Sequence, residues 1–156
     1  MSSKGLITVL AGVMAIALIV VGCGSSDEEA TAKPIAKAAF LKRADSICAE
    51  TYKRVQNGYE ATFKNPSGGE PLSDLKEIEA YADGVLIPAK EEEVEELRAL
   101  GVPPGDEDQV EGILAAYEVG IERAEESPRD AVVSSAGVFV KATELAQDYG
   151  LELCRY

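Results

Sequence analysis

Apolar residues recur through most of the chain at intervals of three and four, which is the spacing of one face of an α-helix. No run alternates convincingly between apolar and polar residues, as a half-buried strand would. Loop and cap signals divide the apolar stripes into four segments between residues 35 and 150. The sequence therefore predicts an all-α fold built from amphipathic helices.

The first predicted helix covers about residues 35–59 and can extend to Phe63. The second begins at Ser73, a good N-cap residue, and ends at Gly101, which suits a left-handed C-terminal position. Pro88 lies inside it and lacks an amide donor, so it predicts a kink or a short break. The two apolar faces are Phe40, Leu41, Ala44, Ile47, Cys48, Thr51 and Val55, and Leu75, Ile78, Ala82, Val85, Leu86, Ala89, Val94, Leu97 and Leu100.

The third predicted helix begins at Asp106, where the residues DEDQ resemble a capping box. The fourth begins at Ser127, with Pro128 at a position that needs no amide donor, and continues to Gly150. Four such helices with short connections predict an antiparallel four-helix bundle with a kinked second helix. The last two apolar faces are Val110, Ile113, Leu114, Tyr117, Ile121 and Ala124, and Val132, Ala136, Phe139, Val140, Thr143 and Ala146.

The N-terminal residues have a different pattern. Lys4 precedes an uncharged apolar run from Leu6 to Val21, and small residues follow it. This order is the signature of an export signal. As a helix the 16-residue run spans about 24 Å, less than the ~30 Å hydrocarbon core, which disfavours a transmembrane anchor. An uncleaved anchor and a cleaved secreted form stay open as alternatives.

Val20-Val21-Gly22-Cys23 resembles the lipobox of bacterial lipoproteins, in which aliphatic and small residues precede an obligatory Cys. The resemblance implies that the Cys23 thiol receives a diacylglycerol and that a peptidase cuts before it. Residues 1–22 are then a signal peptide, 23–34 the lipidated Cys and a flexible tether, and 35–156 the helical domain. The implied location is the extracytoplasmic face of the cell membrane, to which the lipid attaches the protein.

Charge narrows the range of partners. The chain has 28 acidic and 15 basic residues, a net charge of −13 that becomes −14 once Lys4 is removed with the signal. Nucleic acid is excluded as a partner, because affinity for it depends on Lys and Arg neutralising phosphates. Anionic lipid head groups repel the same acidic surface, so we expect the domain to stand off the membrane on its tether.

The two other cysteines, Cys48 and Cys154, form an even pair in an oxidising compartment, which predicts a disulfide between them. Two buried free thiols are the alternative. The tail after Gly150 can reach Cys48 if it doubles back along the bundle. In that position Leu151 and Leu153 are expected to cover apolar surface.

The stretch Phe40-Leu-Lys-Arg-Ala-Asp-Ser-Ile-Cys48, together with Tyr149-Gly-Leu-Glu-Leu-Cys154, resembles uncharacterised small secreted and lipoprotein families of actinobacteria. This resemblance spans most of the mature domain. It implies an exported helical protein and brings no catalytic residues with it.

Few residues are candidates for a site. Tyr59, Tyr81 and Tyr117 could line a ligand pocket inside the bundle, although such tyrosines more commonly form the rim of a helical core. The acidic run at 91–96 is interpreted as a solvated helix face. The acids at 106–108 do not match a calcium-binding loop, because Glu111 and Tyr117 replace its Gly and final Glu. We therefore predict no metal site and no cofactor.

The sequence indicates no enzyme. It has no His, no nucleophile motif, no Gly-rich phosphate loop and no spare Cys, although a carboxylate-based hydrolase remains a weaker alternative. We expect a lipid-anchored extracytoplasmic domain with a binding or structural role at the cell surface, its partner an unidentified surface protein or small ligand. The alternative is a carrier or sensor of a small ligand or cation in the bundle interior.

Overall fold

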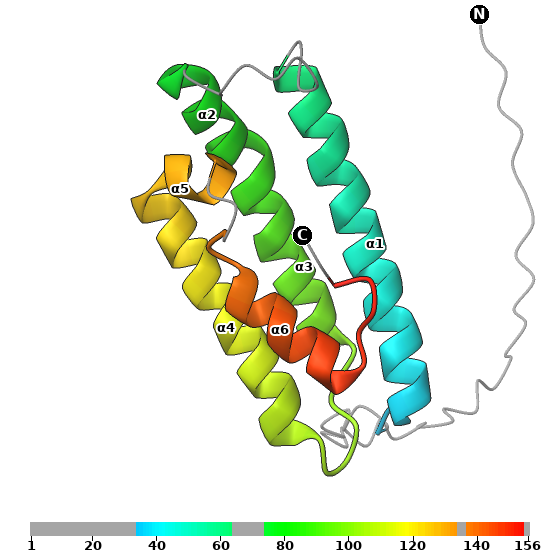
Figure 1. Ribbon diagram of the computed structural model, residues 1–156. Helices are drawn as coiled ribbons and strands as arrows, with labels where there is room; N and C mark the ends of the chain where they lie inside the picture. The colour runs from blue at the N-terminus through cyan, green and yellow to red at the C-terminus, as the bar shows by residue number, and fades with distance from the viewer. Residues whose placement is uncertain (1–33, 64–73, 134–136, 155–156) are drawn as a thin grey trace, which may run out of the picture. The chain divides into compact units, whose positions relative to one another are not determined.

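The computed structural model of the chain describes residues 34–63, 74–133 and 137–154 (Figure 1). The predicted signal peptide, the lipobox with Cys23, and all of the tether except Pro34 lie outside the described residues. Among the residues that are described, every regular element is a helix. The all-α class predicted from the apolar spacing is confirmed.

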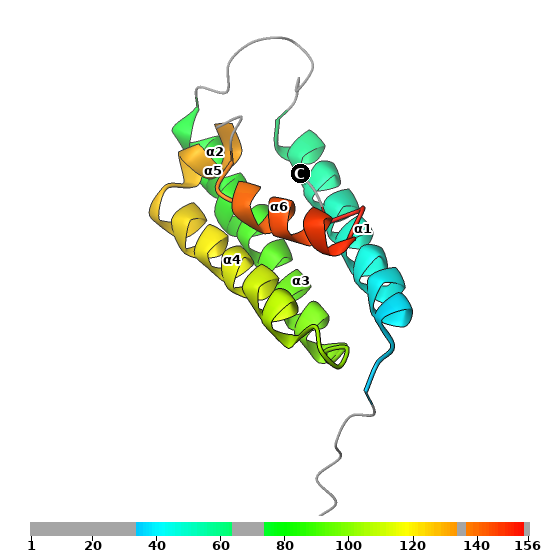
Figure 2. The same ribbon diagram turned by 60° about the horizontal axis from the view of Figure 1, so that its bottom comes forward.

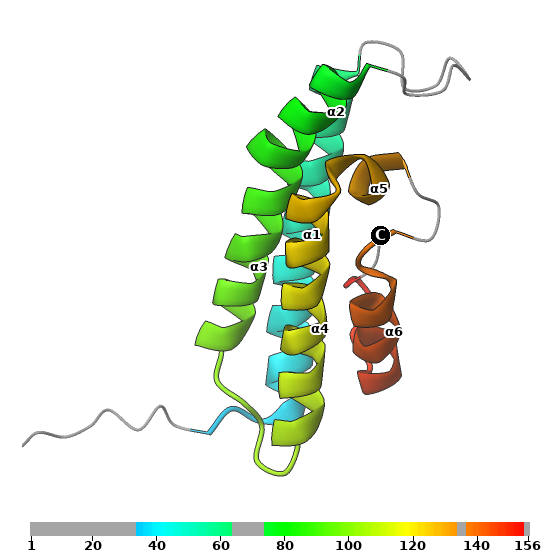
Figure 3. The ribbon, with the colours of Figure 1, turned by 90° about the vertical axis from the view of Figure 1, so that its left-hand side faces the viewer.

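The elements in chain order are α1 (Lys37–Thr62), α2 (Leu75–Tyr81), the π-helix η1 (Ala82–Leu86), α3 (Ile87–Ala99), α4 (Glu107–Glu126), α5 (Pro128–Val133) and α6 (Val140–Tyr149). Helix α3 packs against both α1 and α4, and α6 packs against α4. Figure 1 shows α1 and α4 running in one direction and α3 in the other. Helix α6 lies obliquely across them (Figure 2) and on the side away from α3 (Figure 3).

The second predicted helix is irregular near Pro88, as predicted, but the irregularity is a π-helical turn rather than a kink or a break. Helices α2 and α3 are joined through η1 with no intervening loop. The Ile87 amide donates to the Ala82 carbonyl, five residues back, as a π-helix requires. Pro88 occupies the first turn of α3. The wider π turn accommodates a residue that has no amide and whose ring crowds the preceding turn.

The helix ends agree only in part with the predicted caps. Asp74 is the N-cap of α2, and its Oδ1 accepts hydrogen bonds from the amides of Lys76 at 2.9 Å and Glu77 at 3.4 Å. The predicted cap, Ser73, lies outside the described residues. Gly101 has the predicted left-handed backbone, with φ of 73°. Asp106 is the N-cap of α4, but its side chain does not cap the helix as the DEDQ pattern predicts.

The single fourth helix predicted over residues 128–150 is wrong, and the four-helix antiparallel bundle is not confirmed. The structure has two short helices there, α5 and α6. Gly137 adopts a left-handed backbone with φ of 61°, which ends helical continuity and resets the phase of α6. Val140, predicted to be buried, is exposed as a result, and Ala142, Ala146 and Tyr149 form the buried face instead.

The core lies between the three long helices and α6. In α1 the predicted face is confirmed, because Phe40, Ala44, Cys48, Thr51 and Val55 are buried. Tyr117 and Ile113 of α4 and Leu97 of α3 are buried with it. Two charged residues, Lys90 and Glu93, are buried among these apolar side chains.

Candidate functional site

Lys90 and Glu93 form an ion pair inside the protein. Both belong to α3, one helical turn apart, and their side chains are 5% and 0% exposed. The Lys90 Nζ donates to both carboxylate oxygens of Glu93, at 3.0 Å to Oε1 and 2.8 Å to Oε2. Removing two charges from water costs several kcal/mol each, so such a pair persists only because each partner compensates the other.

Aromatic rings enclose the ammonium end of this pair. The Lys90 Nζ lies 5.1 Å from the ring centroid of Tyr117 in α4 and 5.8 Å from that of Phe139, just before α6. A cation over the face of an aromatic ring is attracted by the ring quadrupole. Gly120 lets Phe139 approach α4, because a Cβ at that position would lie 2.4 Å from the Phe139 ring.

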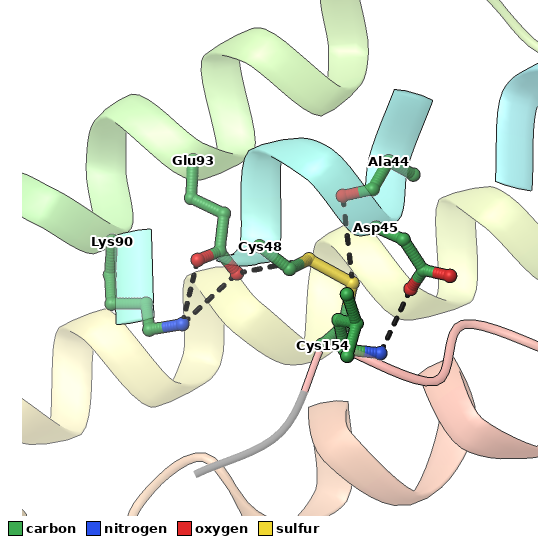
Figure 4. Close-up of a disulfide and its surroundings, with 7 residues drawn as sticks. Ala44, Asp45, Cys48, Lys90, Glu93 and Cys154 are labelled. Carbon is green, nitrogen blue, oxygen red and sulfur yellow. Dashed lines mark hydrogen bonds and ion pairs between the residues drawn. A yellow bond between two sulfur atoms is a disulfide. The ribbon is translucent and has the colours of Figure 1, made fainter. Parts of the chain in front are cut away.

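The carboxylate end of the pair faces a disulfide (Figure 4). Cys48 of α1 and Cys154 of the tail have their sulfur atoms 1.98 Å apart, so the structure places the predicted bond. The Cys48 Sγ lies 3.9 Å from the Glu93 Oε1. A disulfide sulfur carries no proton, so this is a contact between sulfur and carboxylate rather than a hydrogen bond.

The C-terminal tail reaches Cys48 by reversing direction after α6. Gly150 ends α6 with φ of 109°, and the amides of Gly150 and Leu151 both donate to the Ala146 carbonyl. Leu151 is buried as predicted, but Leu153 is 42% exposed, contrary to prediction. Its amide instead donates to the Asp45 Oδ1 at 2.9 Å, which holds the tail against α1.

The interior changes the acidity of the groups around the pair. Burial lowers the pKa of Lys90, and the nearby Glu93 carboxylate opposes that effect. Burial also raises the pKa of Tyr117, with the negative charge of Glu93 as the second cause. Within the described part of the chain, the Tyr117 hydroxyl is buried with no hydrogen-bond partner. The Glu93 carboxylate thus accepts hydrogen bonds from a buried ammonium and lies in contact with a disulfide sulfur, and its negative charge acts on the Tyr117 phenol.

The candidate ligand-binding tyrosines do not form one group. Tyr59 and Tyr81 meet edge to face, with ring centroids 5.6 Å apart, and both contact Phe63. The Tyr81 hydroxyl donates to the Val55 carbonyl at 3.2 Å, and burial raises the pKa of Tyr81 to about 12. Tyr117 contacts Lys90 and Phe139 instead. The three tyrosines therefore have core contacts in two groups, and their ligand-binding role stays a prediction.

A depression of about 210 Å³ lies outside the buried pair, between α1 and α3. It is lined by Glu50, Thr51, Arg54, Glu92 and Glu96. Arg54 and Glu92 are paired with each other across it. Among the residues described, no cluster of three or more His, Cys, Asp or Glu has the arrangement of a metal site.

A second polar cluster joins three helix ends. The Tyr149 hydroxyl of α6 donates to the Asp106 Oδ2 at 2.8 Å, and Lys37 of α1 lies 3.2 Å from the same oxygen. The Lys37 Nζ also lies 4.1 Å from the centroid of the Tyr149 ring. The Tyr149 hydrogen bond and the Lys37 ammonium lower the pKa of Asp106. Burial, then the bond to Asp106, raise the pKa of Tyr149.

The buried pair is the feature that the sequence analysis missed. Glu93 lies inside the acidic run, of which Glu91, Glu92, Glu95 and Glu96 are exposed as predicted. A signal was present, however. Leu86, Lys90, Glu93 and Leu97 are separated by four, three and four residues, which places them on one helix face with two leucines at its ends.

No protein-family model, curated protein or solved structure matches this chain. No helix in the described ranges has the length and hydrophobicity needed to cross a membrane. The residues and their contacts are therefore the basis for the function proposed below.

Proposed function

We propose that this chain is a lipid-anchored extracytoplasmic protein whose helical domain has a binding or structural role at the cell surface. The observation that carries the proposal is the bond between Cys48 and Cys154. Disulfides persist in oxidising compartments and are rare where thiols are kept reduced. An exported location is also what the lipobox resemblance around Cys23 implies.

The interior supports a binding or structural role over a catalytic one. Lys90 and Glu93 are the charged residues buried in the described core, and each is the partner of the other. A general acid or base has to reach substrate, whereas these side chains are enclosed by α1, α4 and Phe139. The two buried charges are therefore partners of each other and are not open to a substrate.

Lipidation is tested by a Cys23→Ala variant, with Ser25→Ala as the matched control. Two acyl chains give stable membrane anchoring. We expect Cys23→Ala to leave the membrane fraction or to retain residues 1–22, and Ser25→Ala to behave as the wild type. Fractionation followed by mass spectrometry of the N-terminus measures both. Normal processing and membrane retention of Cys23→Ala would contradict the anchor.

The alternative function, a carrier of a small ligand or cation within the helices, has less support. The tyrosines expected to line its site lie in two separate places, Tyr59 and Tyr81 in one and Tyr117 in the other. Thermal unfolding with and without millimolar Ca²⁺ tests the cation version, because a ligand of the native state raises the melting temperature. An unchanged melting temperature would remove it.

A further inference from the structure

The surroundings of the disulfide bear on how it can be reduced. A thiolate attacks one sulfur in line with the bond, the bond between the sulfurs breaks, and the other sulfur departs with the electron pair as a thiolate. The two sulfurs are not equivalent here. Cys48 is held in the middle of α1, whereas Cys154 belongs to a tail.

Attack on Cys48 has to come from the side away from Cys154. Figure 4 shows the Glu93 carboxylate on that side, with its Oε1 3.9 Å from the Cys48 Sγ. A thiolate on this path meets a buried negative charge at short range. The low dielectric of the interior strengthens that repulsion relative to water.

Attack on Cys154 avoids this approach but expels Cys48 as a thiolate. The departing negative charge then lies beside the same carboxylate oxygen. A leaving thiol departs more slowly when its thiolate is destabilised. Lys90 donates to both carboxylate oxygens, including the Oε1 that contacts Cys48. Its ammonium lies on the other side of the carboxylate from the disulfide (Figure 4), so the group in contact with the Cys48 sulfur is the negative one.

We propose that Glu93 protects the Cys48–Cys154 disulfide against thiol reductants, beyond the protection that burial provides. Both routes of exchange place negative charge next to the Glu93 carboxylate, one on the attacking sulfur and one on the departing sulfur. Lys90 binds both oxygens of this carboxylate and so holds it in place beside Cys48. The ion pair is a redox-protective device built into the contact between α1 and α3.

The test measures the rate of reduction by dithiothreitol under native conditions. Its first thiolate forms a mixed disulfide with one cysteine, and its second thiol displaces that cysteine, so two electrons pass to the protein and solvent protonates the thiolates. Free thiols are alkylated and counted at timed intervals. Glu93→Gln keeps the side-chain shape and removes the negative charge. Glu91→Gln removes the same charge from an exposed position of the same helix.

We expect Glu93→Gln to be reduced at least about fivefold faster than the wild type, because the charge adjacent to both reacting sulfurs is gone. Glu91→Gln is expected to match the wild type. In denaturant, where the carboxylate no longer faces Cys48, the variants and the wild type should react at one rate. A persistent difference there would overturn the proposal.

A second variant separates protection from stability. Lys90→Met/Glu93→Met fills the same space with apolar side chains, and such replacements of buried ion pairs are often neutral or stabilising. We expect it to unfold no more easily than the wild type and still to be reduced at least about fivefold faster. Ile78→Ala in α2 supplies a core destabilised to a similar degree with the carboxylate intact.

Two results would refute the proposal. One is a double variant that is as stable as the wild type and is reduced just as slowly. The other is a rate for Glu93→Gln that equals the rate for Ile78→Ala once both are compared at equal unfolding free energy. Either outcome would assign the resistance to burial alone.

Discussion

Glu93 is fully enclosed, yet it lies in a sequence of six residues of which five are Glu. Its environment differs from that of its neighbours because a helix turns by about 100° per residue, so adjacent acids face different media. Glu91 and Glu92 are solvated, whereas Glu93 points at Lys90 and Cys48. Position on the helix, rather than residue type, decides what each carboxylate does.

Removing one partner of the buried pair should lower the unfolding free energy strongly, whereas replacing both partners with apolar residues should not. We expect Glu93→Gln and Lys90→Met each to lower the unfolding free energy by about 3–5 kcal/mol, because each leaves one charge buried without its partner. Lys90→Met/Glu93→Met is expected to be neutral or to gain about 1–4 kcal/mol. Chemical denaturation measures the unfolding free energy of the wild type, the two single variants and the double variant. Single and double losses that simply add would show that the two charges do not interact.

Asp106 contributes to the way the stability of the fold depends on pH in the acid range. Its pKa is lowered in the folded state, first by the Tyr149 hydrogen bond and then by Lys37. A depressed carboxyl pKa stabilises the fold above the unfolded value of 3.8, and that stability is lost as pH falls through the folded pKa. We therefore expect Asp106→Asn to lose less stability than the wild type below about pH 5.

Thermal unfolding from neutral pH to the acid range tests this, with Asp108→Asn as the matched control. Asp108 is exposed two residues further along α4 and should leave the slope unchanged. An Asp106→Asn curve parallel to the wild-type curve would contradict the assignment.

The residue scale is where the sequence was least informative. The even number of cysteines predicts Cys48 and Cys154 as partners, and the structure has their sulfurs at bonding distance. The predicted apolar face of the second helix does not include Lys90, and the whole acidic run at 91–96 is predicted to be a solvated face. Burial of a charge depends on which residues close over it from other elements, here Tyr117 and Phe139, and helical spacing along one segment does not contain that information.

The contact between α4 and α6 depends on a small residue. A Cβ on Gly120 would lie 2.4 Å from the Phe139 ring and 3.2 Å from the Val138 carbonyl oxygen. Gly112, two turns earlier on the same helix, has open space where its Cβ would be. The two glycines therefore offer a matched pair in which helix propensity is the same and packing differs.

We expect Gly120→Ala to lower the unfolding free energy by about 1–3 kcal/mol, because the ring and the backbone before α6 have to move. Gly112→Ala is expected to raise it by up to about 1 kcal/mol through helix propensity alone. Urea denaturation compares them. If both substitutions stabilise the protein, the close approach of Phe139 to α4 is not a constraint.

Helices were easier to predict than the environment of single residues, and each wrong helix prediction has a local cause. The stripes of α1 and α4 and the disturbance at Pro88 follow from spacing and from the missing amide. The prediction of a single fourth helix is wrong because it takes Gly137 as a helix residue. The composition Ser134-Ser135-Ala136-Gly137 is typical of a loop. Because Gly137 has a left-handed backbone, the helical phase before it does not predict which later residues are buried.

At the scale of the whole molecule, α6 is joined to α1 by the tail as well as by the contacts of Tyr149 with Phe40 and Lys37. Helix α6 packs on α4, and the tail adds the disulfide and the bond from Leu153 to Asp45. The Cys48–Cys154 bond closes a loop of 106 residue steps, which restricts the unfolded chain strongly.

Removing this bond should cost much of the stability of the fold. We expect Cys48→Ala/Cys154→Ala to lower the unfolding free energy by about 4–5 kcal/mol in the chain-entropy model. The amides of Gly150 and Leu151 should then exchange with solvent faster than those of α4, because the tail loses its covalent attachment. Denaturation and amide hydrogen exchange measure the two effects. Unchanged exchange at Leu151 would show that packing alone holds the tail.

The same bond determines how the folded domain would respond to mechanical force. If the chain is pulled from residue 34 and from residue 154, tension enters α1, passes through Cys48 and leaves through Cys154. Only residues 34–48, at the start of α1, can be pulled straight, to a full length of about 50 Å at ~3.5 Å each. Residues 49–153 lie in a closed covalent loop that bears no load. The α3–α4–α6 core would therefore stay folded under a pull that straightens the start of α1.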